Sequence, residues 1–201
     1  MHPSAHLDTF TRDNLPDKAD WPELTFDLPA TQYPPQLNCA VELVDRQVDA
    51  GHADRMAILG QDEAWTYTQL AANINRIANI LVSDLGVVPG NRILLRFPNS
   101  PLFAACYLAV LKCGAVAVPT MPLLREAELS VIVEKAQVRF AICDSRLMDE
   151  IRGLPFDGVL QSEQIRVQLS SISAEFTAVA TASDDVGVIT FTSGTTGKPK
   201  G

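Results

Sequence analysis

The chain has 201 residues, of which 47% are hydrophobic, so it is long and apolar enough to form a folded core rather than a disordered segment. Its formal net charge of −8 argues against binding to nucleic acid or to an anionic membrane surface. The sequence has neither an apolar run of ~18 residues nor a recognisable secretory leader, and we therefore expect a cytoplasmic protein without a membrane span.

The first 37 residues carry six of the thirteen prolines and show no apolar period. This composition predicts an extended arm over residues 1–37 that wraps the rest of the protein. Its large apolar side chains, Trp21, Phe26 and Leu28, are the expected anchors of the arm. The folded domain is then expected to span residues 38–201.

Helical and strand patterns alternate from residue 38 onward. Asn38 is predicted to cap a helix that ends at Gly51, and Thr66 with Gln69 forms the T-x-x-Q capping box of a second helix. The expected elements, in chain order, are a helix 38–50, a strand 56–59, a helix 66–85, a strand 92–97, a buried helix 102–113, a strand 115–118 that Pro119 ends, a helix 125–136, a strand 138–143, a short helix 145–151 and a candidate strand 165–169.

The apolar run VGVITF at 186–191 predicts one more buried strand before the end of the chain. Strands that alternate with helices of 10–15 residues are typical of α/β proteins. We therefore expect an α/β fold with a mostly parallel sheet and helices on both of its faces.

The cysteines and histidines do not form a pattern that predicts a metal site. The four cysteines have no CxxC spacing, and the three histidines lie among polar residues near the start of the chain. We expect reduced, packed cysteines and neither a zinc site nor a Cys–His nucleophile. The cysteines are Cys39, Cys106, Cys113 and Cys143.

The decapeptide TSGTTGKPKG at 192–201 has the composition of a loop that binds phosphate. Its glycines allow the backbone to approach a ligand closely, and successive N–H groups in such a turn form a concave nest for an anion. The hydroxyls add donors and the lysines add positive charge. The expected ATP phosphate-binding residues are Thr192, Ser193, Gly194, Thr195, Thr196, Gly197, Lys198 and Lys200.

Two other interpretations of the decapeptide fit less well. The Walker loop GxxxxGK[ST] requires Ser or Thr after the lysine, but Pro199 follows Lys198, and Thr192 stands where the first glycine belongs. A flexible linker would explain the Gly, Ser and Thr content, but not the preceding apolar strand or the Lys-Pro-Lys ending. A phosphate-binding loop is the interpretation that accounts for all of these features.

The decapeptide resembles the phosphate-loop signature of the adenylate-forming superfamily, which includes acyl- and aryl-CoA ligases, peptide-synthetase adenylation domains and luciferases. WTYTQL at 65–70 and LAVLKCGAVAVP at 108–119 are similar to earlier segments of that superfamily. The stretches YPPQLNCAVELVDR at 33–46, LVSDLGVVPGNRILLRFPN at 81–99 and TMPLLREAEL at 120–129 are most similar to aryl-CoA ligases of the benzoate and 2-aminobenzoate type.

The resemblance implies a function for the parent enzyme. It would be an acid–thiol ligase (AMP-forming) that takes a small-molecule carboxylic acid, ATP with Mg²⁺, and coenzyme A. In the family the adenine-binding segment, the acidic magnesium ligand, the ribose-binding aspartate and the lysine of the small domain all follow the loop. Residues 38–201 would therefore be the N-terminal portion of an adenylation domain truncated at the phosphate loop, with neither a catalytic residue nor a metal ligand.

Other functions remain open from the sequence. The parent could be an acyl-CoA ligase for aliphatic acids or an adenylation domain that loads a carrier protein, and the chain itself could be a non-catalytic piece. We expect residues 1–201 alone to be inactive and to self-associate through an apolar strand edge. The oligomeric state and the identity of the acid stay open.

Overall fold

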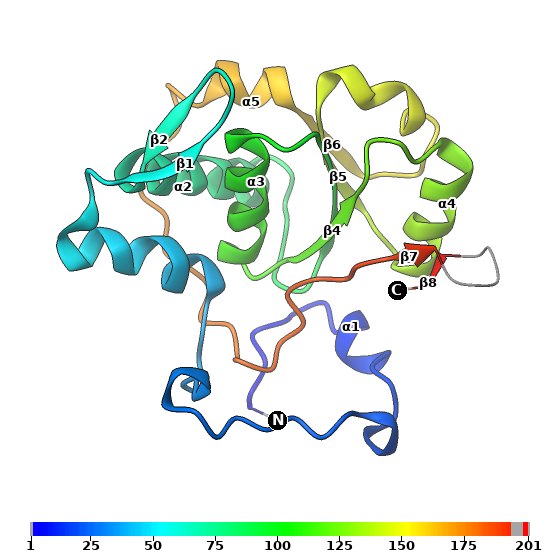
Figure 1. Ribbon diagram of the computed structural model, residues 1–201. Coiled ribbons are helices and arrows are strands. Elements are labelled where there is room, and N and C mark those ends of the chain that lie inside the picture. Colours follow the sequence, from blue (N-terminus) through cyan, green and yellow to red (C-terminus); the bar gives the residue numbers. More distant parts are fainter. Residues whose placement is uncertain (1, 194–198, 201) are drawn as a thin grey trace.

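The computed structural model describes residues 2–193 and 199–200, and Figure 1 shows how their helices and strands are arranged. The elements are α1 (Phe10–Asp13), η1 (Lys18–Asp20), η2 (Pro29–Thr31), η3 (Val41–Asp45), η4 (Val48–His52), β1 (Met56–Leu59), β2 (Ala64–Thr66), α2 (Tyr67–Ser83), β3 (Arg92–Arg96), α3 (Pro101–Lys112), β4 (Val116–Thr120), α4 (Glu126–Lys135), β5 (Phe140–Cys143), η5 (Ser145–Glu150), β6 (Gly158–Gln161), α5 (Ser162–Gln168), β7 (Thr192–Ser193) and β8 (Pro199–Lys200).

A parallel sheet with the strand order β4-β3-β5-β6 forms the centre of the protein. Its register pairs Leu94 of β3 with Val118 of β4 on one side and with Ala141 of β5 on the other. Helices follow β3 and β4, as the alternation in the sequence predicts. The predicted α/β class with a mostly parallel sheet is confirmed.

Side chains alternate between the two faces of this sheet, and both faces are buried. Ile93 and Leu95 pack in a core with α2 and α3, whereas Leu94 packs in a second core with α4. All three side chains are fully buried. Figure 1 shows α2 and α3 on one side of the sheet and α4 on the other, so the expectation of helices on both faces is confirmed.

The predicted helix caps are present. The Thr66 hydroxyl accepts a hydrogen bond from the Gln69 amide, and the Gln69 side chain accepts one from the Thr66 amide, as a capping box requires. Asn38 caps the first long helical stretch by accepting from the Ala40 amide. That stretch covers residues 39–52, includes the π-helical turns η3 and η4, and contains Gly51 at a φ of 83°.

The expectation that Pro119 ends its strand is wrong, because β4 continues to Thr120. Pro119 pairs with Leu95 of β3. The Ala117 amide donates to the Gly187 carbonyl on the outer side of β4, and the backbone of Pro119 faces the same side two residues later. At this position a backbone amide would point away from β3. A proline therefore removes no hydrogen bond between β4 and β3, and their pairing continues to Thr120.

The candidate strand at 165–169 is also wrong, because Ile165 lies in α5. Ile165 and Val167 would share one face of a strand, but Ile165 is fully buried and Val167 is 77% exposed. The helix begins with reciprocal bonds between Gln161 and Gln164. The strand of this region is instead β6, four residues long, which the sequence analysis missed.

The expected anchors of the N-terminal arm are wrong as well. Trp21, Phe26 and Leu28 are 38%, 54% and 67% exposed. The arm is attached through its first residues, where His6 and Thr11 are buried. Large apolar side chains were a poor guide because polar contacts of residues 2–12 hold the arm in place.

The run at 186–191 is not the buried strand that the sequence predicts. It lies parallel to β4 and forms one isolated bridge, between Val188 and Ala117. Val188 is 38% exposed. The next bond of the ladder would be donated by the amide of residue 119, which is proline, and so the pairing stops after this bridge.

Candidate functional site

The described ends of the predicted phosphate loop lie side by side. β7 pairs with β8 in antiparallel register, Thr192 opposite Lys200 and Ser193 opposite Pro199. This hairpin lies beside α4 (Figure 1). Because the segment 186–191 runs parallel to β4, its end at Thr192 emerges at the carboxyl edge of the sheet, where parallel α/β sheets bind ligands.

The loop between these strands is described only in part. Gly194, Thr195, Thr196, Gly197 and Lys198 lie outside the described residues, as does Gly201. The predicted phosphate-binding role of these residues therefore falls outside the described structure. For Ser193 and Lys200 the structure describes the backbone pairing alone.

A cavity of about 470 Å³ lies at the same edge, next to Thr192. Residues after β3, residues at the end of β4, one side of α4 and the segment before β7 form its walls. Phe97 and Phe103 stack in this wall with ring centroids 5.9 Å apart. The lining residues are Phe97, Asn99, Phe103, Pro119, Thr120, Met121, Pro122, Leu124, Glu128, Ile132, Thr190, Phe191 and Thr192. The cavity is mostly apolar and suits an apolar ligand group.

Arg96 holds one wall of this cavity in place. Its guanidinium donates to the carbonyls of Met121, Pro122 and Leu124 at 2.8–3.0 Å, and to that of Leu147 at 3.4 Å. The residue is 1% exposed. Burial lowers the pKa of the Arg96 guanidinium, but a guanidinium stays protonated in proteins. Arg96 thus fixes the loop 121–124 rather than contacting a ligand itself.

Residues near the N-terminus bind Asp185, which directly precedes the segment 186–191 that leads to the hairpin. The Asp185 carboxylate accepts hydrogen bonds from the Ser4 hydroxyl, the Ala5 amide at 3.2 Å and the Ala182 amide at 2.9 Å. Arg12 forms an ion pair with it at 3.1 Å. We call residues 2–12 the N-terminal strap.

The N-terminal strap is itself tied to the amino end of β3. Asp8 forms an ion pair with the buried Arg92 at 2.5 Å, and Phe10 lies 4.6 Å from the same guanidinium in a cation–π contact. Arg92 also donates to the carbonyls of Ala136 and Gln137. The strap therefore links Arg92 of β3 to Asp185, which directly precedes the segment 186–191.

A second candidate site is a polar crevice between the carboxyl ends of β3 and β5. At this point of the sheet, the connection after β3 leads to β4 on one side and the connection after β5 leads to β6 on the other. Its charges are already paired: Asp144 accepts from Arg146 at 2.8 Å, and Arg166 donates to Glu63 at 2.9 Å. The crevice has a volume of about 200 Å³. These internal pairs make it a weaker candidate than the cavity beside Thr192.

The expected packing of the cysteines is confirmed for three of them and is wrong for Cys39. Cys106, Cys113 and Cys143 are buried and free, whereas Cys39 is exposed. Burial raises the pKa of Cys106, and it raises the pKa of Cys113 to about 12. No cluster of three His, Cys, Asp or Glu side chains suited to a metal occurs within residues 2–193 and 199–200. Within the same residues, no helix has the length and apolar character needed to cross a membrane.

Sequence reasoning missed the residues that position the site. Arg92 and Arg96 carry the clearest available signal, because both stand in the otherwise apolar run RILLRF. A charged residue in a strand buried on both faces needs internal partners. The sequence could have flagged that need, but not the carbonyls that meet it, because these belong to distant loops.

The sequence profile of a protein family described as AMP-binding enzyme matches residues 44–201. The uncharacterized acyl–CoA ligase YtcI from Bacillus subtilis (strain 168) is 31% identical over 151 residues, which make up 71% of this chain and 28% of that protein. Benzoate–CoA ligase from Thauera aromatica is 26% identical over 183 residues, 86% of this chain and 35% of that protein. The chain thus spans about a third of the length of these two relatives.

A third relative is much longer than the region that it shares with this chain. The hybrid PKS-NRPS synthetase xenE from Xenoacremonium sinensis is 31% identical over 175 residues, which are 85% of this chain and 4% of that protein. Among solved structures, the anthranilate CoA ligase AuaEII in complex with anthranoyl-AMP superposes with a TM-score of 0.77 at 24% identity. The match covers 86% of this chain and 34% of that one, and it shows a shared fold.

Proposed function

Since this chain belongs to the AMP-binding enzyme family, we propose that it supplies the phosphate-binding loop of an acid–thiol ligase that uses ATP to activate a carboxylic acid. The observation that carries the proposal is the pairing of Thr192–Ser193 with Pro199–Lys200 at the carboxyl edge of the sheet. This pairing closes a hairpin around the Gly- and Thr-rich loop inside the region that the family profile matches. Residues 38–201 would be the first portion of an adenylation domain, with residues 1–37 as its arm.

The reaction has two halves. A carboxylate oxygen attacks the α-phosphorus of ATP, and the bond to pyrophosphate breaks to give an acyl-adenylate. The sulfur of a thiol, that of coenzyme A, then attacks the acyl carbon and releases AMP, which gives the thioester. In the first half the loop would hold the β- and γ-phosphates and stabilise the charge that develops on pyrophosphate. Hydrogen bonds to a charged phosphate contribute about 1.5–3 kcal/mol each.

The proposed acid is aromatic, of the benzoate or 2-aminobenzoate type. The similarity to the benzoate–CoA ligase of Thauera aromatica supports this substrate class. The mostly apolar cavity next to Thr192 is compatible with it. Free ATP and coenzyme A are the reactants, which supports a cytoplasmic location. Mg²⁺ would enter with ATP as part of the substrate, and no protein ligand for it is assigned within the described residues.

A second candidate function is the loading of a carrier protein. The similarity to the hybrid PKS-NRPS synthetase favours it, because that relative carries the same kind of region within a much longer chain. The first half-reaction would be unchanged, and the acceptor would be a protein-bound thiol. An assay with free coenzyme A distinguishes the two, since only the coenzyme A ligase gives a soluble thioester.

The test uses a polypeptide in which this chain is followed by the remaining region of an AMP-binding enzyme. We expect Thr195→Ala and Thr196→Ala to slow acid-dependent ATP–pyrophosphate exchange at least tenfold. Thioester formation from a supplied acyl-adenylate should change little, because pyrophosphate has left before that half-reaction. Thr195→Ser and Thr196→Ser keep the hydroxyl and serve as matched controls. Equal losses in both half-reactions would show that the loop is structural, and absence of any acid-dependent exchange would refute the ligase assignment.

A further inference from the structure

The N-terminal region holds residues 181–185 from two sides. On one side the contact is made through the backbone: the Ser183 amide donates to the Pro35 carbonyl at 3.0 Å, and the Leu37 amide donates to the Thr181 carbonyl at 2.9 Å. On the other side the N-terminal strap binds the carboxylate that ends this stretch. The same five residues are therefore bound by two separate parts of the N-terminal region.

The strap supplies most of the partners of the Asp185 carboxylate. The Ser4 hydroxyl and the Ala5 amide donate to it, and the Arg12 guanidinium forms an ion pair with it at 3.1 Å. The Asp185 side chain is 3% exposed, so its negative charge needs partners inside the protein. In the described part of the chain, the Ala182 amide is the one donor to this carboxylate that does not belong to the strap.

The segment 186–191 begins directly after Asp185. In the described part of the chain, its backbone is joined to β4 at one residue: the Ala117 amide donates to the Gly187 carbonyl, and the Ile189 amide donates to the Ala117 carbonyl, both at 2.9 Å. Two bonds to one residue hold the middle of the segment, but a second fixed point is needed to set its direction. Asp185 is such a point, because it is held before the segment begins.

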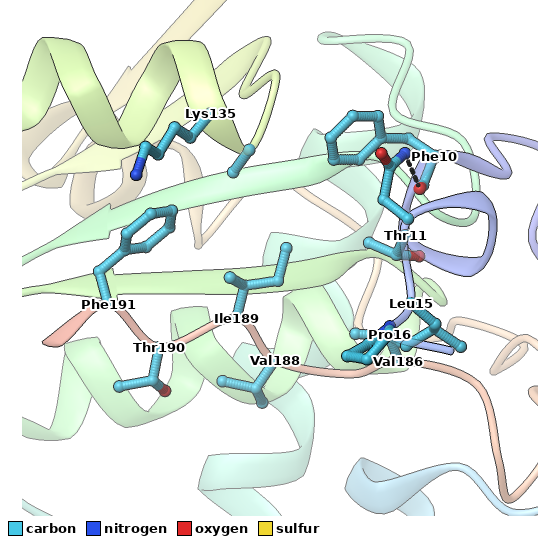
Figure 2. A pocket seen from close by; sticks show the side chains of 12 residues that line it. Phe10, Thr11, Leu15, Pro16, Lys135, Val186, Val188, Ile189, Thr190 and Phe191 are labelled. Carbon is cyan, nitrogen blue, oxygen red and sulfur yellow. Dashed lines mark hydrogen bonds between the residues drawn. The ribbon is translucent and has the colours of Figure 1, made fainter. Parts of the chain in front are cut away.

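The N-terminal contacts are concentrated at the start of the segment. A groove of about 640 Å³ lies between the segment and the N-terminal region. Figure 2 shows Leu15 and Pro16 at the Val186 end of this groove and Phe191 at the opposite end. The strap therefore acts on the far end of the segment, next to Thr192, through the chain between them rather than by direct contact.

We propose that Ser4 and Arg12 are positioning residues for the proposed phosphate loop. By holding Asp185 they keep the segment 186–191 in register with β4, and this register places Thr192 at the carboxyl edge of the sheet. Positioning of this kind matters because a displacement of about 1 Å slows a reaction by on the order of a hundredfold. The inference rests on the proposed function of the loop.

Hydrogen exchange of residues 1–201 tests the hold of the strap without ATP. Neither hydrophobic core includes a residue of the strap, so loss of its bonds should loosen the segment and leave the cores intact. In Arg12→Met, we expect the Ile189 amide to exchange at least tenfold faster than in the unaltered chain, whereas the amides of β3 and β5 should exchange at unchanged rates. Ser4→Ala removes a different bond to the same carboxylate and should act in the same direction.

Two control variants accompany these measurements. Arg12→Lys keeps a positive charge beside Asp185 and should restore most of the protection of the Ile189 amide. Lys18→Met changes an exposed residue outside the strap and should exchange as the unaltered chain does. Unchanged Ile189 exchange in both Arg12→Met and Ser4→Ala would overturn the proposal. Equally faster exchange in β3 and β5 would also overturn it, because the strap would then stabilise the whole fold rather than position the segment.

A kinetic measurement uses the longer polypeptide of the ligase test. Arg12→Met should raise the KM for ATP in acid-dependent ATP–pyrophosphate exchange at least tenfold and change thioester formation from a supplied acyl-adenylate little. Arg12→Lys should return this KM towards that of the unaltered polypeptide. An unchanged KM despite faster Ile189 exchange, or equal losses in both half-reactions, would overturn the positioning role. Absence of exchange in the unaltered polypeptide would instead refute the ligase assignment, so the two failures are distinguishable.

Discussion

The guanidinium of Arg96 donates to backbone carbonyls of two separate loops, at residues 121–124 and at Leu147. Arg96→Met would leave these carbonyls unsatisfied in a buried site, and hydrogen bonds to charged groups contribute about 1.5–3 kcal/mol each. Because such losses are not additive, we expect the free energy of unfolding to fall by about 3 kcal/mol, measured by urea denaturation. Arg152→Met removes a guanidinium that is 75% exposed and should change stability by less than about 0.5 kcal/mol. A loss for Arg96→Met as small as that of the control would contradict this role.

The thiols offer a second measurement at the scale of single residues. Cys106, Cys113 and Cys143 are buried, and Cys39 is exposed. Burial raises the pKa of Cys143 to about 12, which leaves very little thiolate at neutral pH. Ellman's reagent at pH 7.5 should therefore modify Cys39 quickly and the other cysteines only after unfolding in urea. Cys39→Ser should abolish the fast phase, and rapid modification of Cys106 in the native protein would overturn the buried position of α3.

At the scale of elements, the contribution of the N-terminal strap to stability should be largest near neutral pH and should be lost in acid. Burial alone raises the pKa of Asp185, but hydrogen bonds from Ser4, Ala182 and Ala5 outweigh it and hold that pKa below its ordinary value. A lowered folded-state pKa contributes stability above the unfolded value of about 3.9, and this stability is lost as the pH falls through the folded value. Asp185→Asn should thus cost about 2 kcal/mol at pH 7 and much less below pH 3.

The control for the strap is Asp62→Asn, at an exposed carboxylate in a turn. Urea unfolding at a series of pH values between 2.5 and 7 measures both variants. The free energies of unfolding of Asp185→Asn and of the unaltered chain should become equal in acid. That of Asp62→Asn should equal the value for the unaltered chain at every pH. If the free energy of unfolding of Asp185→Asn is lower by the same amount at every pH, the charge of the Asp185 carboxylate does not hold the strap in place.

Local sequence signals predicted the helices better than the edges of the sheet. The Thr66–Gln69 capping box works through residues three apart, and so the sequence alone determines it. The failure at 165–169 has the opposite cause, because Ile165 and Leu169 fit either a strand or a helix and tertiary packing decides between them. The run at 186–191 failed for a similar reason: its composition suits a buried strand, but burial depends on neighbours on both sides.

For the candidate site, the sequence predicted the loop and the structure describes its two ends. The pairing of Thr192 with Lys200 fits a hairpin around the Gly-rich loop, which composition alone could not distinguish from a linker. The supports of the site could not be predicted, because Arg96 and Asp185 act through backbone groups of loops that are distant in sequence. Hydrogen bonds to backbone carbonyls and amides leave little trace in a single sequence.

At the scale of the whole molecule, we expect residues 1–201 alone to show no carboxylate-dependent ATP–pyrophosphate exchange. Holding the reactants in position contributes about 7–11 kcal/mol to lowering such a barrier, and it requires several groups that converge on one ATP. The chain supplies the proposed phosphate loop and no metal-binding cluster within its described residues. Benzoate–CoA ligase from Thauera aromatica is the positive control. Exchange stimulated by benzoate or 2-aminobenzoate in the purified, monodisperse chain would show that the chain is sufficient for adenylation.

Pro119 determines how far the outer ladder of the sheet can run. The bonds between Ala117 and the segment 186–191 would continue with a bond from the amide of residue 119 to the Ile189 carbonyl, and proline has no amide hydrogen to give. The last residues of the segment are thereby released from β4, and the hairpin after them lies beside α4. A residue in an early strand therefore determines where a much later part of the chain leaves the sheet, directly before the hairpin that the proposed phosphate loop would join.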